Sequence, residues 1–154
     1  MINIKTYAYN NWGFQIFWSP PRQHLQNGEL LGYYIGYKQT KDTDHPYKFE
    51  TVSVNENHRM ILSFSLRGLS KYTEYSITVQ AFNKEGTGPT QLPIAVIYTE
   101  EDVPSISPHN VVCESHTSTT VDLSWEFQYQ SPEINGVFLG FSVFFKPLRE
   151  WTGW

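Results

Sequence analysis

Apolar and polar residues alternate with a period of two along most of the first hundred positions. The clearest run places Tyr75, Ile77, Val79 and Ala81 in alternation with mainly polar side chains. This period is typical of strands that turn one face to a core and the other to water. It predicts seven strands, at residues 3–9, 14–19, 31–39, 47–54, 60–67, 73–83 and 92–98. Because no window shows sustained helical periodicity, we predict an all-β chain whose first hundred residues form a seven-stranded sandwich.

Turn residues separate the predicted strands. Asn27-Gly28 supplies the positive φ of a tight turn, and Pro20-Pro21 fixes an extended exit that cannot continue a ladder. The run Gly86-Thr87-Gly88-Pro89 breaks the chain before the last strand. The strand at 47–54 changes its apolar parity midway, which predicts a bulged edge strand.

The pattern of the first unit begins again after residue 108. Trp18 precedes Gly32 by 14 positions, Trp125 precedes Gly140 by 15, and the two tryptophans are 107 positions apart. A repeat of this length indicates a duplicated domain. We therefore predict a domain at 1–99, an acidic and proline-containing extended linker at 100–108, and a partial copy at 109–154.

The partial copy repeats only the first three strands, near 111–115, 121–125 and 141–145. Nothing in its sequence supplies an opposing half for its six inward apolar residues, Val121, Leu123, Trp125, Phe141, Val143 and Phe145. We expect residues 1–98 to fold cooperatively and residues 105–154 to be frayed or prone to aggregation. The polar first ten residues and this partial copy suggest a fragment or an incomplete gene model.

Composition narrows the function classes. The chain is 40% hydrophobic and 16% aromatic, enough to build a core, and its net charge of −4 argues against a nucleic-acid partner. The sequence has no apolar stretch long enough to span a membrane. Cys113 is the only cysteine, which excludes a disulfide within the chain. A single cysteine does not indicate whether the protein resides in an oxidising or a reducing compartment.

Three sequence patterns resemble those of fibronectin type III domains. They are Phe14-x-Ile16-x-Trp18, Gly32-Tyr33-x-Ile35-x-Tyr37, and a run of nine matched positions from Leu69 to Gly88. The resemblance implies an immunoglobulin-like sandwich, followed here by a truncated second copy. It also implies that the Tyr75 hydroxyl bonds to backbone near Leu69.

A closer similarity covers nearly the whole chain. The runs 27–38, 49–51, 72–76, 81–89 and 135–137, together with Trp151, resemble consecutive repeats of the Down syndrome cell adhesion molecule (Dscam) family, although the stretch 127–133 departs from it. The resemblance implies a stalk segment of a plasma membrane receptor, on its extracellular side, with roles in homophilic adhesion and in axon and dendrite guidance. The implied partners are proteins, bound through domains outside this chain, with no small-molecule substrate. The alternative is a spacer in a secreted carbohydrate-active enzyme or an intracellular muscle protein, which flanking sequence would distinguish.

Catalytic and metal sites find little support in the sequence. The histidines lie scattered in predicted turns and loops, at positions 24, 45, 58, 109 and 116, without a catalytic partner at a recognisable spacing. His109, Cys113 and His116 are zinc-type residues without a fourth ligand, and Asp42, Asp44 and Glu50 lack the spacing of a calcium loop. We therefore expect neither catalysis nor a metal or other cofactor.

The aromatic residues divide between core and surface by strand parity. Inward positions predict core packing for Trp18, Tyr33, Tyr37, Tyr75 and Trp125. Outward positions make Phe17, Tyr34, Phe82 and Phe144 the best candidates for a contact surface, with packing between domains as the favoured role. Cys113 is expected to be a small buried strand residue. No specific binding residues are identified beyond these candidates.

Overall fold

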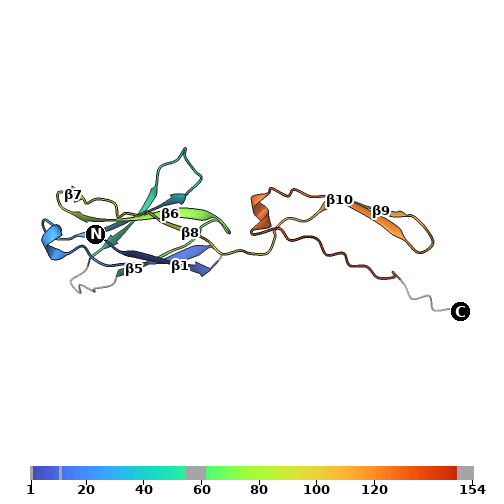
Figure 1. Cartoon of the computed structure of the whole chain (residues 1–154), viewed down its shortest axis with the longest axis horizontal. Coiled ribbons are helices and arrows are strands. Elements are labelled where there is room, and N and C mark those ends of the chain that lie inside the picture. The colour runs from blue at the N-terminus through green and yellow to red at the C-terminus, as the bar shows by residue number, and fades with distance from the viewer. Residues whose placement is uncertain (1, 11, 55–61, 149–154) are drawn as a thin grey trace.

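The computed structural model describes residues 2–10, 12–54 and 62–148, and its first part is a sandwich of two sheets (Figure 1). One sheet has the order β1-β2-β5, with β1 at Ile4–Asn10, β2 at Gly13–Trp18 and β5 at Leu62–Leu66. The other has the order β4-β3-β6-β7, with β8 also paired to β6. Its strands are β3 Gly32–Gln39, β4 Lys48–Ser53, β6 Glu74–Asn83, β7 Gly86–Thr87 and β8 Ala95–Tyr98. The predicted all-β sandwich is confirmed.

The core lies between the two sheets and consists of the inward side chains of the alternating runs. Phe14, Ile16, Tyr33, Ile35 and Val79 have no exposed surface. The indole of Trp18 meets the ring of Tyr33 edge to face, with 5.3 Å between ring centroids. Burial raises the pKa of Tyr33 to about 12, because the phenolate would have to be desolvated.

The predicted core aromatics are found there to different degrees. Trp18, Tyr33 and Tyr75 are buried, whereas Tyr37 is half-buried at the margin of the core. Trp125 is also half-buried, and it packs edge to face on Phe141 with 5.0 Å between centroids. This pair occupies the same repeat positions as Trp18 and Tyr33, so the two halves of the chain share their local packing.

The predicted bulge in the fourth strand is wrong. Strand β4 is at the edge of its sheet as expected, but it pairs with β3 without interruption, from Gly32 opposite Ser53 to Tyr37 opposite Lys48. The change in apolar parity has another cause: Val52 is half-buried against the core, whereas Phe49 is exposed on the outer face and packs beside Tyr34.

The last strand of the sandwich is shorter than predicted and is preceded by a short hairpin. Strand β8 begins at Ala95 rather than at 92, and Gly86–Thr87 pairs with the end of β6. Between them the buried side chain of Gln91 serves the β6 backbone, accepting from Val79 N–H at 2.7 Å and donating to Ile77 C=O at 3.2 Å. Proline has no N–H to offer a ladder, and Pro89 and Pro93 flank this break. Of the predicted strand 60–67, residues 60 and 61 lie outside the described residues.

The second part of the chain forms a hairpin of β9, His109–Ser115, and β10, Val121–Glu126. The predicted third strand at 141–145 is wrong, since these residues are extended but form no strand. Its counterpart β3 is paired on both sides, by β4 and β6, and no such neighbours lie beside 141–145 among the described residues. The expectation of a buried Cys113 is also wrong, because β9 is exposed along its whole length.

A single-turn 3-10 segment precedes the Asn-Gly turn in each half of the chain. These segments are η1 at Gln23–Leu25 and η2 at Pro132–Ile134. Within the described ranges no helix has the length and apolarity needed to cross a membrane.

Candidate functional site: the joint at residues 99–105

The segment that leaves β8 is fixed to the sandwich by a buried threonine. Thr99 is 1% exposed, and its N–H donates to Thr73 C=O at 3.1 Å. Its hydroxyl donates to Ser70 C=O at 2.6 Å and accepts from Thr73 N–H at 2.9 Å. A single side chain therefore ties the exit of the sandwich to the loop between β5 and β6.

Two further contacts continue along the linker on the same side. Tyr72 N–H donates to Glu100 C=O at 3.1 Å, and Lys71 Nζ lies 2.5 Å from Asp102 Oδ2. The hydrogen bond from Lys71 lowers the pKa of the Asp102 carboxyl, with a smaller contribution from Val103 N–H. The ion pair is partly exposed, so it contributes little to the free energy of folding and mainly helps to orient the linker against the sandwich.

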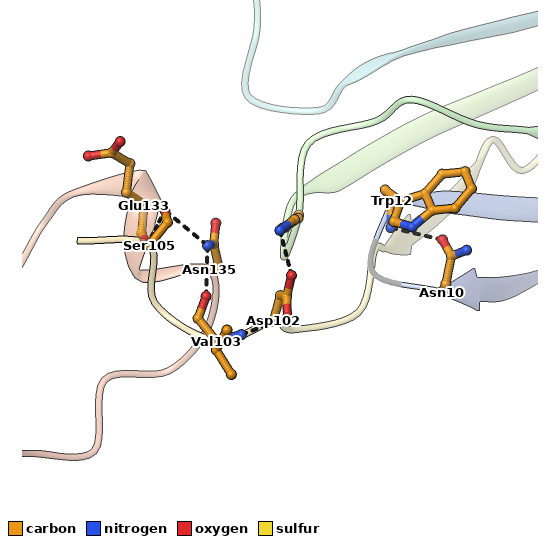
Figure 2. A network of polar contacts seen from close by, with 8 residues as sticks. Asn10, Trp12, Asp102, Val103, Ser105, Glu133 and Asn135 are labelled. Atoms are coloured by element: carbon orange, nitrogen blue, oxygen red, sulfur yellow. Dashed lines mark hydrogen bonds and ion pairs between the residues drawn. The ribbon is translucent and has the colours of Figure 1, made fainter. Parts of the chain in front are cut away.

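The other side of the same segment is bonded to the turn that follows η2. Asp102 N–H donates to Asn135 C=O and Ser105 N–H to Glu133 C=O, both at 2.8 Å. Asn135 Nδ2 donates to Val103 C=O at 3.0 Å. Figure 2 shows the side-chain contacts around the linker, with Asp102 facing the sandwich and the Asn135 amide facing Val103 and Ser105 from the second part.

A carboxylate completes this side of the joint. Glu101 Oε1 accepts from Val137 N–H at 2.6 Å. A Cβ at Gly136 would lie 2.6 Å from the same oxygen, so only glycine lets the carboxylate approach the turn this closely. Asn135 itself has φ 57, a left-handed conformation that asparagine tolerates better than most residues.

The arrangement is a joint of about seven residues bonded on both sides, and we name residues 99–105 the joint. Sequence reasoning placed an extended linker here but gave Thr99, Lys71 and Asn135 no role in holding it. Two features of the sequence could have indicated the joint: the repeated Asn-Gly turn and the acidic segment between the two units. Backbone N–H groups of a turn are ready partners for a carboxylate.

The predicted contact-surface residues are only partly brought together. Tyr34 and Phe82 stack with 4.4 Å between centroids, and Phe49 joins them 6.5 Å from Tyr34. Phe17 lies on the opposite sheet beside Tyr7, and Phe144 is 92% exposed in the extended segment. The four residues therefore do not form one surface.

The residues considered for metal sites lie apart, and the histidines among them pair with carboxylates. His109 Nε2 is 3.3 Å from Glu126 Oε2, and His116 Nδ1 is 3.0 Å from Asp122 Oδ2. Within the described ranges no three or more metal-type side chains are grouped.

The calcium-type residue Asp42 has a histidine neighbour of its own. His45 Nδ1 lies 2.9 Å from Asp42 Oδ2, and this hydrogen bond lowers the pKa of Asp42. Asp44 donates its backbone N–H to the same carboxylate. His58 lies outside the described residues.

Comparisons with known proteins agree with this fold. The model of the fibronectin type III domain matches residues 3–97, and the chain belongs to this family. The fn3 domain of human contactin 1 superimposes with a TM-score of 0.54 at 20% identity, over 68% of this chain and 80% of that one, which supports the fold.

Among proteins with fibronectin type III domains, curated relatives of this chain confirm the resemblance to the Dscam family. Cell adhesion molecule Dscam1 of Drosophila melanogaster is 36% identical over 152 residues, which is 97% of this chain and 7% of that protein. Human cell adhesion molecule DSCAM is 35% identical over 131 residues, 85% of this chain and 6% of that protein. Dscam2 of Drosophila melanogaster is 37% identical over 139 residues, again 6% of its length. The chain thus spans 6 to 7% of the relatives it matches.

Proposed function

We propose that this chain is a stalk segment of an adhesion receptor resembling the Dscam family, without catalytic activity of its own. Residues 1–99 form one fibronectin type III module, residues 100–108 link it onward, and residues 109–154 begin a second module. The segment acts at the extracellular face of the plasma membrane, with protein partners and a role in homophilic adhesion and in axon and dendrite guidance.

The observation that carries the proposal is the two-sided bonding of the joint. Asp102 contacts Lys71 of the first module through its side chain and Asn135 of the second part through its backbone. A linker bonded to both neighbours limits the angle between modules, whereas a free linker would leave it open. Fixed angles are what a stalk needs to hold distant recognition domains in a defined position.

The functional test is a segment exchange in a relative. The matching segment of Drosophila Dscam1 is replaced by this chain, and the receptor is expressed on suspended cells. We expect surface display and cell aggregation to remain within about twofold of the unmodified receptor. The reason is that the matching segment aligns with 97% of this chain at 36% identity. Normal display with abolished aggregation would contradict the proposed role.

The joint itself is tested by a double-mutant cycle on Glu101 and Gly136. Gly136→Ala places a methyl where the Glu101 carboxylate lies, so it should displace the carboxylate and loosen the joint. In the presence of Glu101→Ala the same substitution should have a much smaller effect, since the crowded oxygen is gone. Nitrogen-15 relaxation reports the freedom between the two parts, and additive effects would show that the two residues do not act together.

A further inference from the structure

The first module carries a turn equivalent to the one that holds the joint. Asn27-Gly28 lies 108 positions before Asn135-Gly136, and both asparagines are left-handed, with φ of 53 and 57. Each turn follows a single-turn 3-10 segment, although η1 begins and ends one position earlier in the repeat than η2. Both turns therefore contain a left-handed asparagine at the same repeat position, although Gly28 has φ 147 and Gly136 does not share that positive φ.

The groups that bind the joint have direct counterparts in this first turn. The second part uses the carbonyls of Glu133 and Asn135, the Asn135 amide and Val137 N–H. The counterparts are the carbonyls of Leu25 and Asn27, the Asn27 amide and Glu29 N–H. Within residues 2–10, 12–54 and 62–148, none of these four groups is paired.

The first turn is held in shape from within its own module. Asn83 Nδ2, from the end of β6, donates to Gln26 C=O at 3.2 Å, and Gln26 Nε2 donates to Pro21 C=O at 2.9 Å. The turn therefore has its conformation before anything binds it, which lowers the cost of association.

A groove adjoins the turn and offers apolar surface beside the polar groups. It has a volume of about 760 Å³ and runs between residues 21–30 and 81–92. Leu25 and Leu92 line it and are 52% and 67% exposed. A segment bound along the turn would place its neighbouring residues over this groove.

We propose that the turn Leu25–Glu29 binds an extended acidic segment with the chemistry of residues 101–105, supplied by a second copy of the first module and its linker. A glutamate carboxylate accepts from Glu29 N–H, while backbone N–H groups of the segment donate to the carbonyls of Leu25 and Asn27. The Asn27 amide donates to a backbone carbonyl of the segment. The inference rests on the proposed joint, whose bonding pattern it extends to the first module.

The test is a fusion in which residues 1–108 precede residues 2–154, so that one protein contains both the proposed joint and the one already described. Tethering raises the effective concentration of the linker at the turn to about the millimolar range. Segmental nitrogen-15 labelling distinguishes the two copies of Glu29. We expect the amide hydrogen of the following copy to exchange roughly tenfold more slowly than that of the leading copy, as a hydrogen bond to a charged acceptor would produce.

A pair of matched variants in the leading linker identifies the acceptor. Glu101→Gln in that linker should remove most of the slowing, whereas Glu100→Gln should leave it unchanged, because in the described joint it is the Glu101 carboxylate that accepts from Val137 N–H. Equal effects of the two variants would overturn the assignment of the carboxylate.

The two joints in this fusion separate the possible failures. If the following Glu29 exchanges as fast as the leading one while Val137 N–H stays protected, the inference about the first turn is wrong and the proposed stalk stands. If Val137 N–H is unprotected as well, the joint of the proposed function fails with it.

Discussion

The hydroxyl of Tyr75 accepts a hydrogen bond from the backbone N–H of Ser70, with 3.0 Å between the two atoms. The ring of Tyr75 is buried against Phe14, with 5.9 Å between centroids, while its hydroxyl reaches the loop after β5. The bond therefore links the start of β6 to the loop that also carries Lys71 and Tyr72. The resemblance placed this contact near Leu69, and the partner is the next residue.

Tyr75→Phe should lower the free energy of unfolding by about 1 to 3 kcal/mol, because Ser70 N–H loses its acceptor while the ring still fills its place. Equilibrium urea denaturation of the full chain measures the change. Tyr72→Phe is the matched control, since Tyr72 is 40% exposed and makes no side-chain hydrogen bond among the described residues. Equal losses for the two variants would show that the Tyr75 hydroxyl is not a stabilising contact.

Gln91→Ala should cost about 2 to 4 kcal/mol of unfolding free energy, because it strips a partner from both Val79 N–H and Ile77 C=O in the interior. The exchange of the Val79 amide hydrogen should quicken more than that of other β6 amides. Gln39→Ala, at an exposed end of β3, serves as the control. Unchanged protection of Val79 in the Gln91 variant would contradict the role given to this side chain.

The joint should weaken in acid. The Lys71 hydrogen bond lowers the pKa of Asp102 below its ordinary 3.8, so the bond favours the joint above that value. The contribution is lost as the pH falls through the lowered pKa. Carbon-13 titration of the carboxyl measures it, and Lys71→Met should raise the pKa toward 3.8 and loosen the joint at neutral pH. Lys84→Met is the control, because Lys84 is exposed and, among the residues that the structure describes, pairs only with Glu85, at 3.8 Å. A pKa that stays low in the Lys71 variant would contradict this account.

Native-state hydrogen exchange should divide the chain in two. Amides of β6, which lies between β3 and β8, should exchange slowly, whereas those of residues 121–145, apart from Val137 with its bond to Glu101, should exchange at least about a hundredfold faster. The reason is that β9 and β10 form a two-stranded sheet whose faces are largely exposed. Slow exchange across 121–145 in a verified monomer would refute the prediction.

The sandwich was predictable because its strands repeat one simple rule. Inward positions such as Ile16, Ile35 and Val79 are apolar at every second residue, and each is buried. Prediction from sequence fails where an apolar side chain covers the outer face or a polar side chain is buried. Phe49 is apolar yet covers the outer face, so parity suggested a bulge that does not exist, and Gln91 is polar yet buried because it substitutes for a strand that prolines interrupt.

The joint could be foreseen only in outline. The prolines and acidic residues of 100–108 indicated an extended linker, but the partners of Glu101 and Asp102 come from loops about 30 residues away in either direction. Contacts of that separation depend on how the sandwich closes, and a local pattern does not contain them. Cys113 failed for a related reason: its strand alternates like a core strand, but the described residues include no second sheet to cover it.

Strand β8 leads directly into Thr99, so a pull along the chain is felt by the few hydrogen bonds of residues 99–105 before it reaches the long ladders of the sandwich. Under load the molecule would lengthen in two stages, first by releasing this short segment and only later by unravelling β-structure. Such a segment extends at low force, before the domains on either side of it unfold.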